Sequence, residues 1–474
     1  MISFHSISFF VYLIVTISGV VTVLMDNKQP AKAVAWILAM FFIPFVGIIL
    51  YIFFGKNTRK EKYISRRSMD ELTRRSMLSF AGQEDLQLPP ANKSLMMLFT
   101  NQNWALPFKD NLVDIYTSGH DFFLRLMLEI GKAKDHIHLD TYIIEDDPLG
   151  NLIADALADK VRQGVEVRII YDDVGCWRVK DRFFHRMRER GIDVYAFMPV
   201  RFPAFTSKVN YRNHRKLCVI DGKVGFVGGM NVAMRYVKGT PRQEWRDTHL
   251  VVEGGGVYAI QRAFLVDWYF VSRTLINDRK YYPPLSSGVS NNCLMQLVTS
   301  SPVSPWADIM QGYVRILLQA QRYVYMQTPY FLPTEPVLFA MSTAALSGID
   351  VRLMVPRYGD AKLAEWASRS FVMEAIEAGV KVYLYAPGFN HSKLLVCDDN
   401  LCSCGSSNID FRSFENNFEA NAFFYDEDMA LRMKQVFLQD ERQCVLVDDV
   451  SIFVRRPFLK RLFESVVRLL SPLL

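Results

Sequence analysis

Two long apolar runs open the chain. Residues 7–25 and residues 33–54 contain no charged side chain, and each reaches the ~20 residues needed to cross the hydrocarbon core of a bilayer. The pattern predicts a transmembrane helical hairpin within residues 1–55. A cleaved signal peptide is the alternative for the first run, but no basic segment precedes it and no small-residue cleavage site follows it.

Basic residues follow the second apolar run closely. Cytoplasmic flanks of membrane helices carry an excess of Lys and Arg, so this bias places both the N-terminus and the large C-terminal part on the cytoplasmic side. We expect residues 56–108 to form a basic juxtamembrane linker that contacts an anionic leaflet, with a solvated linker as the alternative. The basic residues just after the run are Lys56, Arg59, Lys60, Lys62, Arg66, Arg67, Arg74 and Arg75.

From residue 109 onward, apolar strand-like segments alternate with helix-like segments, and five sequence blocks occur twice in the same order. The repetition predicts an α/β fold of two duplicated sandwich domains, residues 109–280 and 281–474, with helices between mostly buried strands. Chance similarity between unrelated α/β units is the alternative, but the blocks share polar as well as apolar positions. The paired blocks are 132–144 with 319–331, 163–173 with 347–357, 189–199 with 377–387, 211–221 with 388–398, and 245–254 with 418–426.

The fourth pair of blocks carries the candidate chemistry. YRNHRKLCVID contains His214, Lys216 and Asp221, and a short tetrapeptide that ends in Asn231 follows it. A strand places side chains two residues apart on one face, so we expect this His and Lys to point the same way. A Lys supplies positive charge for a phosphate oxygen, an Asn donates a hydrogen bond, and a His is a nucleophile or a proton donor.

The second copy, GFNHSKLLVCD, repeats this plan. It contains His391, Lys393 and Asp398, and a tetrapeptide ending in Asn408 follows it. A single His-x-Lys pair is weak evidence for function, whereas two copies with identical internal spacing are strong evidence. The sequence therefore predicts two matched sets of phosphate-binding and nucleophilic side chains.

The doubled pattern H-x-K-x4-D, followed by six residues and G-[GS]-x-N, resembles the phospholipase D superfamily. The apolar hairpin, its basic flank and the segment NHRKLCVIDGKVGFVGGMN resemble bacterial cardiolipin synthases with two such motifs, over nearly the whole chain. The resemblance implies two pseudo-two-fold related α/β domains that share one active site. One departure is that Gly229 stands where the second copy has Ser406, so only one half carries a hydroxyl near the phosphate.

The same resemblance implies a mechanism. One histidine attacks the phosphodiester phosphorus to form a phosphatidyl-histidine, and the other protonates the leaving oxygen and later deprotonates the incoming hydroxyl. Analogy with the family favours His214 as the nucleophile, although the sequence leaves this assignment open. Metal ions and cofactors are not required. The expected phosphate ligands are Lys216, Lys393, Asn231, Asn408 and Ser406.

Four acidic residues have expected roles beside these groups. Asp247 and Glu419 occupy matched places in the fifth pair of blocks, and we expect them to orient the histidines as buried acids. Asp221 and Asp398 belong to the catalytic motif, but we expect them to bond backbone amides at the turn that follows each strand.

The last twenty residues form a basic amphipathic pattern. Phe458, Leu459, Leu462, Phe463, Val466, Leu469 and Leu470 recur at helical spacing, opposite Arg456, Lys460, Arg461 and Arg468. Such a helix is typical of a membrane surface, and a helix packed on the protein itself is the alternative.

The resemblance implies a phosphatidyltransferase on the cytoplasmic side of a bacterial inner membrane that joins two phosphatidylglycerol molecules into cardiolipin. The expected partners are these lipids and an anionic membrane surface, with the oligomeric state left open. A nucleic acid is not an expected partner, because the net charge of +6 is modest for a chain of 474 residues. Two alternatives are a phospholipase D that hydrolyses its lipid and an inactive lipid-binding scaffold.

Overall fold

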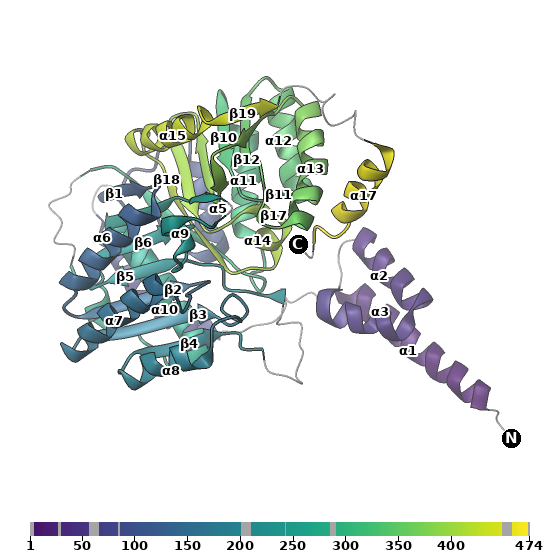
Figure 1. Ribbon diagram of the computed structural model, residues 1–474, viewed down its shortest axis with the longest axis horizontal. Coiled ribbons are helices and arrows are strands. Elements are labelled where there is room, and N and C mark those ends of the chain that lie inside the picture. Colours follow the sequence, from purple (N-terminus) through teal and green to yellow (C-terminus); the bar gives the residue numbers. More distant parts are fainter. Residues whose placement is uncertain are drawn as a thin grey trace.

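The computed structural model describes residues 4–26, 30–55, 66–83, 86–200, 210–241, 243–284, 291–447 and 457–472. Two α/β units lie against each other, and the first three helices of the chain project from them (Figure 1). The N-terminal helices are α1 (Phe4–Asp26), α2 (Pro30–Phe42), α3 (Pro44–Leu50), a π-helical turn (Tyr51–Gly55), α4 (Arg66–Ala81) and α5 (Lys93–Asn103).

The first unit is a seven-stranded sheet in the order β1-β8-β6-β5-β2-β3-β4. Strands β2, β3 and β4 run parallel, and the remaining pairs are antiparallel. Its strands are β1 (Asn111–Tyr116), β2 (His136–Thr141), β3 (Glu166–Asp172), β4 (Asp193–Phe197), β5 (Leu217–Ile220), β6 (Val224–Gly228) and β8 (His249–Gly254). Its helices are α6 (Gly119–Lys132), α7 (Pro148–Arg162), α8 (Asp181–Glu189), α9 (Arg235–Lys238), α10 (Gly256–Ser272) and a 3₁₀ turn (Arg279–Tyr281).

The second unit is an eight-stranded sheet in the order β19-β13-β12-β10-β15-β16-β18-β9. Its strands are β9 (Met295–Ser300), β10 (Tyr323–Gln327), β12 (Asp350–Pro356), β13 (Lys381–Tyr385), β15 (Leu394–Cys397), β16 (Leu401–Gly405), β18 (Glu419–Phe424) and β19 (Cys444–Val447). Its helices are α11 (Asp308–Gln319), α12 (Glu335–Leu346), α13 (Lys362–Glu377), α14 (Phe411–Glu415), α15 (Glu427–Glu441) and α17 (Phe458–Arg468). Four short strands form two small ladders: β11 (Phe331–Leu332) with β17 (Ile409–Asp410), and β14 (Gly388–Asn390) with β7 (Glu244–Arg246).

The two sheets have the same strand order once β19 is set aside, which confirms the predicted duplication. Each strand of the first sheet has a counterpart in the second, from β1 and β9 at one edge to β4 and β13. The registers agree as well, because Gly228 pairs with His249 between β6 and β8, and Gly405 pairs with Asn421 between β16 and β18. These pairs place Asp247 opposite Glu419 in the repeat, as the aligned blocks predict.

One apolar core runs through both units. Buried Val227 and Leu250 of the first sheet belong to the same cluster as Cys404 and Ala422 of the second. At roughly 25 cal/mol per Å² of apolar surface removed from water, such a shared core strongly favours the joined arrangement. The two sheets therefore form one folded body rather than two units on a linker.

The segment 56–108, expected to be a linker, contributes to this body within its described part. Helix α4 packs against α10, and α5 buries Leu95, Met96 and Phe99 in the core of the second unit. The apolar positions of α5 recur at i, i+1 and i+4, which gives the helix one buried stripe. A helix that precedes the first unit in sequence is thus part of the second.

The predicted transmembrane hairpin is not supported. Among the described residues, no helix combines the length and the hydropathy that a membrane span requires. The second apolar run is not one helix, because Pro44 begins α3 after a break at Ile43, where φ is −137°. A proline lacks the backbone N–H that would continue the preceding helix, so the run divides into α2, α3 and a π-helical turn.

Two aspartates anchor corresponding turns of the two units. The carboxylate of Asp398 accepts hydrogen bonds from the backbone N–H groups of Gln321, Arg322 and Tyr323, at 2.7 to 2.9 Å. Asp221 accepts in the same way from Lys134, Asp135 and His136. Each Asp sits in the left-handed region, with φ of 51° for Asp398 and 53° for Asp221, a conformation that Asp tolerates better than most residues.

We predict that Asp398→Ala lowers the free energy of unfolding by about 2–4 kcal/mol, because it leaves three backbone donors without a charged acceptor. Asp398→Asn keeps one acceptor oxygen and should lose less. Urea denaturation followed by circular dichroism measures both, with Asp428→Ala at an 81% exposed side chain as the control. Equal stability of Asp398→Ala and the control would contradict this role.

Candidate functional site

Two histidines, one from each unit, line the same open cavity. His214 and His391 border a space with an empty volume of about 820 Å³ at the junction of the units. Both residues are otherwise buried, with 8% and 6% of their surface exposed. The remaining lining residues are Tyr142, Ile143, Arg212, Asn231, Arg235, Tyr236, Trp245, Tyr330, Asp360, Asn408, Asp410, Arg412 and Asn417.

Each histidine reaches the cavity because its segment pairs with the backbone of the other unit. The His214 N–H donates to the Phe418 carbonyl at 2.9 Å, next to a parallel bridge between Asn213 and Phe418. The His391 N–H donates to the Arg246 carbonyl at 2.7 Å, at the end of the ladder between β14 and β7. We expected each His and Lys to lie within a strand, but β5 and β15 begin one residue after the lysines. The histidines therefore lie at the interface instead of inside their own sheets.

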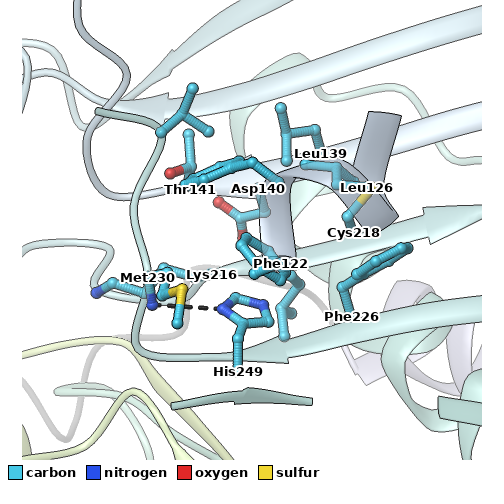
Figure 2. A pocket seen from close by; sticks show the side chains of 13 residues that line it. Phe122, Leu126, Leu139, Asp140, Thr141, Lys216, Cys218, Phe226, Met230 and His249 are labelled. Atoms are coloured by element: carbon cyan, nitrogen blue, oxygen red, sulfur yellow. Dashed lines mark hydrogen bonds between the residues drawn. The ribbon is translucent and has the colours of Figure 1, made fainter. Parts of the chain in front are cut away.

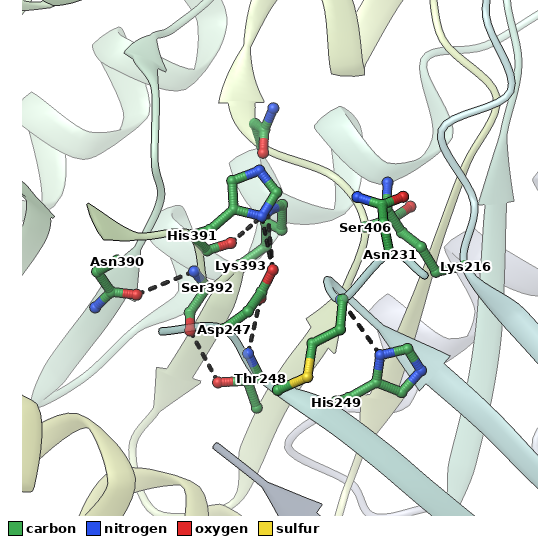
Figure 3. Close-up of polar contacts among 12 residues, drawn as sticks. Lys216, Asn231, Asp247, Thr248, His249, Asn390, His391, Ser392, Lys393 and Ser406 are labelled. Atoms are coloured by element: carbon green, nitrogen blue, oxygen red, sulfur yellow. Dashed lines mark hydrogen bonds and ion pairs between the residues drawn. The ribbon is translucent and has the colours of Figure 1, made fainter. Parts of the chain in front are cut away.

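The acids that hold the histidines are exchanged between the units. His214 Nδ1 lies 3.0 and 3.1 Å from the two carboxylate oxygens of Glu419, and His391 Nδ1 lies 2.6 Å from Asp247 Oδ2 (Figure 3). Both acids are fully buried, with Glu419 at 0% and Asp247 at 2% exposure. The sequence singled out these two acids, but it did not indicate that each serves the histidine of the other half.

This arrangement determines the state of the imidazoles. A carboxylate only accepts, so Nδ1 of each ring carries a proton and Nε2 keeps its lone pair. Burial lowers the pKa of His214 to about 4, although Glu419 opposes the shift. Burial and the nearby Lys393 lower the pKa of His391 to about 3, against the effect of Asp247. Both rings are thus neutral at physiological pH in the free protein, and Nε2 of each is available as a nucleophile.

The two lysines of the motifs lie beside the histidines and are also buried. Lys216 donates to the carbonyl of His214 and lies 5.3 Å from the centre of the Tyr142 ring. Lys393 Nζ lies 2.7 Å from His391 Nδ1 and 3.8 Å from Asp247 Oδ2. Burial lowers the pKa of Lys216 to about 7 and that of Lys393 to about 8. Two buried ammonium groups with weakened proton affinity favour a site that binds an anion.

The two asparagines are placed next to these groups. Asn231 Oδ1 accepts from the Ile143 N–H at 3.1 Å, and its Nδ2 donates to the Tyr236 hydroxyl at 2.6 Å. Asn408 Nδ2 donates to Asp410 at 2.9 Å. An amide nitrogen carries two hydrogens, so each Asn retains one N–H beyond the bond described here.

The difference between Ser406 and Gly229 has a structural explanation. The Ser406 hydroxyl, expected to bind phosphate, donates to Glu419 Oε2 and so belongs to the support of His214. At the matching position of the first unit, a Cβ on Gly229 would collide with the carboxylate of Asp247. In the first unit, Asp247 occupies the space that a side chain at position 229 would need. In the second unit, Glu419 leaves room for the hydroxyl of Ser406.

His249 supports the loop that carries Asn231. Its ring stacks on Phe122 with centroids 4.1 Å apart, and Nδ1 accepts from the Met230 N–H at 3.3 Å (Figure 2). In the second unit, Asn421 Oδ1 accepts from the Ser407 N–H at 3.1 Å, at the same place in the repeat. His249 and Asn421 each accept a hydrogen bond from the backbone of the loop that carries the motif asparagine. This shared contact indicates a structural role for His249.

Asp221 and Asp398 are not part of the cavity, although they belong to the motif. Each follows a four-residue strand that begins just after the motif lysine. At about 3.3 Å per residue, the Asp lies roughly 15 Å from that lysine along the strand. Their carboxylates bind backbone amides at the end of β5 and β15 that lies away from the lysines.

Other lining residues were not found from the sequence. Tyr142 lies edge-on to His214 with ring centroids 4.9 Å apart, and Trp245 lies 5.5 Å from the ring of His391. Trp245 begins the fifth block and Tyr142 lies in the first, so their nearness to matched polar positions was the only available signal.

Comparisons with known proteins agree with this geometry. The family model described as "Cardiolipin synthase, PLD-like domain" matches residues 126–257 and 313–441, and a "Phospholipase_D-nuclease N-terminal" model matches residues 14–56. The chain is 39% identical over the full length of both chains to the major cardiolipin synthase ClsA of Bacillus subtilis. It is 38% identical to a cardiolipin synthase of Geobacillus kaustophilus, over 95% of this chain and 90% of that protein.

Among solved structures, a phosphatidylserine synthase of Haemophilus influenzae has the same fold, with a TM-score of 0.61 and 15% identity. The match covers 80% of this chain and 100% of that one. Together with two histidine motifs in a duplicated fold, these matches show that the chain belongs to the cardiolipin synthase family of the phospholipase D superfamily.

Proposed function

We propose that the protein is a phosphatidyltransferase that joins two phosphatidylglycerol molecules into cardiolipin and releases glycerol. The observation that carries the proposal is the pair of histidines, each held at Nδ1 by a buried acid of the other unit, in one cavity. Membership of the cardiolipin synthase family supports the choice of substrate and product.

In the first step, we assign the attack to His214. Its Nε2 lone pair forms a bond to the phosphorus of the first phosphatidylglycerol, while the bond from phosphorus to the glycerol oxygen breaks. His391 donates a proton to the departing oxygen and glycerol leaves. A bound phosphodiester brings a negative charge near His391, which raises its pKa from the low value of the empty site and allows it to carry that proton.

In the second step, His391 acts as the base. It takes the proton of a hydroxyl of the second phosphatidylglycerol, whose oxygen forms a bond to phosphorus as the bond to His214 Nε2 breaks. Lys216, Lys393 and the free N–H groups of Asn231 and Asn408 stabilise the equatorial phosphate oxygens. Fixed donors of this kind contribute several kcal/mol when they are oriented in advance.

The two alternatives make different demands. A hydrolytic phospholipase D would use the same residues and admit water at the second step, so only the products distinguish it. An inactive lipid-binding scaffold has no need for two buried acid–histidine pairs, which cost several kcal/mol to bury and orient.

We also propose that the protein works at a membrane surface, bound through apolar side chains that face outward. The buried residues Glu464 and Val467 of α17 and Ser471 just after it face the body of the protein, and Arg468 bonds Glu374 of α13 at 2.7 Å. The apolar side chains lie on the outside, the reverse of a helix that packs by its apolar face. The exposed set is Phe458, Leu459, Leu462, Phe463, Val466, Leu469 and Leu470.

Helices α1 to α3 add to this outward apolar surface. Phe10, Ile14, Leu38 and Phe42 are between 50% and 74% exposed. Lys32 at the start of α2 lies 4.8 Å from the ring of Phe411, next to Arg412 of the cavity lining. The apolar helices therefore lie near the mouth of the cavity, where lipid substrates would enter. An inner-membrane, cytoplasmic-side location remains part of this proposal.

We predict that His214→Ala and His391→Ala each lower cardiolipin formation by about 10⁴-fold or more, since each removes a group that acts on phosphorus. The measurement incubates purified protein with radiolabelled phosphatidylglycerol vesicles and separates the lipids. Label bound covalently to His391→Ala, but not to His214→Ala, is expected from the assigned roles. The reverse labelling would exchange the two histidines, and substantial transfer by either variant would contradict a shared site.

Glu419→Gln should lower kcat by about 10²–10⁴-fold, because an amide can donate to Nδ1 and so favour the wrong tautomer of His214. Asp247→Asn should act on His391 in the same way. The lipid assay measures both, and urea denaturation checks that the variants remain folded. Full activity of a folded Glu419→Gln would contradict the positioning role of this acid.

The pH profile of kcat/KM should fall on the alkaline side. As pH rises through about 7 to 8, Lys216 and Lys393 of the free protein lose their protons, so the attraction for the phosphodiester weakens. We expect a loss of about tenfold or more between pH 7 and pH 10. His214 should impose no acid limit above about pH 5, because its pKa in the free protein is about 4, whereas the proton that His391 needs as an acid adds to the alkaline loss. A constant kcat/KM up to pH 10 would contradict the role of the lysines.

A fluorophore attached to Leu469→Cys on α17 should shift its emission to the blue when phosphatidylglycerol vesicles are added, because the side chain at this 78% exposed position would enter the lipid. Leu124→Cys, 55% exposed, is the control and should not shift, because its helix α6 lies on the opposite side of the molecule from α17 (Figure 1). Equal responses at the two positions would contradict insertion of α17.

A further inference from the structure

The centre of the cavity is symmetric, but its two ends are not. At the centre, each half supplies one histidine, one lysine, one asparagine and one acid. These residues therefore present the same chemical groups to both sides of the phosphorus. At the His391 end, Tyr330 lies 6.4 Å from the histidine ring in an edge-on arrangement, and its place in the repeat is taken by Ile143 at the His214 end. The residues outside the repeat pattern are therefore the ones able to distinguish the two headgroups.

Asp360 is the acidic group exposed at the His391 end. It lies in the loop between β12 and α13 and lines the cavity. The Tyr330 hydroxyl lies 2.8 and 2.9 Å from its two carboxylate oxygens, which fixes the orientation of the carboxylate. A carboxylate has about four lone-pair positions, so one donor leaves most of its acceptor capacity available.

A carboxylate is out of place in a site for phosphate alone. Three arginines, Arg212, Arg235 and Arg412, line the same cavity, and Lys216 and Lys393 flank the histidines. These cations attract a phosphodiester, whereas Asp360 repels it and has no donor to offer it. Hydroxyl groups are the natural partners of an exposed, oriented carboxylate, since they donate hydrogen bonds to it.

We propose that Asp360, oriented by Tyr330, accepts a hydrogen bond from the free hydroxyl of a glycerol headgroup whose neighbouring oxygen is bound at His391. The inference rests on the proposed function and adds the residue that recognises the vicinal diol. The glycerol of the first lipid leaves past His391, and the hydroxyl of the second lipid enters there. The same carboxylate thus binds the glycerol headgroup in both steps. An incoming alcohol that has no second hydroxyl group cannot make this hydrogen bond.

The test compares two alcohols that differ by one hydroxyl group. Full-length protein is incubated with phosphatidylglycerol vesicles and equal concentrations of 1-propanol or 1,2-propanediol, and the phosphatidyl alcohols and cardiolipin are measured by mass spectrometry. In the transfer, the alcohol gives its proton to His391, and its oxygen replaces His214 Nε2 on phosphorus. We expect the wild-type protein to prefer the diol, and Asp360→Asn to reduce that preference by about tenfold or more.

Two further variants make the outcome decisive. Tyr330→Phe keeps the carboxylate but frees its orientation, so it should reduce the diol preference by less. Asp428→Asn on α15, outside the cavity lining, is the matched control and should keep the wild-type preference. The proposal is overturned if the wild type shows no diol preference, or if Asp360→Asn and Tyr330→Phe slow both alcohols equally. Failure of the wild type to make any cardiolipin would instead refute the proposed function.

Discussion

Each motif histidine is held by a buried acid that belongs to the other half of the chain, and the rest of the site depends on this exchange. If the units separated, Glu419 and Asp247 would lose their histidine partners, and nothing would hold Nδ1 of either imidazole. Shared apolar packing, the bridge between Asn213 and Phe418, and the ladder of β14 with β7 keep the units together. The interface is therefore part of the proposed active site and not only a contact between the two units.

The exchange is symmetric in its chemistry but not in its supporting contacts. Arg215, between His214 and Lys216, reaches across to the carbonyls of Glu419 and Ser300, at 3.1 and 3.2 Å. Its counterpart Ser392 has a short side chain, whose hydroxyl bonds Thr248 and Arg246 of the first unit. Both long cations thus come from the first unit. A duplicated fold keeps the geometry of its centre while its periphery diverges.

The sequence predicted the parts of the structure that repeat. The paired blocks indicated the duplication of the fold, and they singled out Asp247 and Glu419 as matched acids, because side-chain periodicity survives duplication. The exchange of these acids was not predictable, since no local pattern says which surface of a strand end meets another unit. Ser406 was assigned to phosphate on its residue type alone, and its hydroxyl serves Glu419. The membrane span at residues 33–54 was predicted from the lack of charged residues. That property gives no information about the break before Pro44.

The position of α5 has a consequence for synthesis on the ribosome. Leu95, Met96 and Phe99 belong to the core of the second unit, yet they emerge before any residue of the first. Their partners on α11 and β9 follow about 190 residues later, which at about 5–20 residues per second is a delay of roughly 10–40 s. During that interval the first unit can form its own sheet while α5 remains without its pocket. An apolar helix in this state is a target for chaperones, and completion of the second sheet ends its exposure.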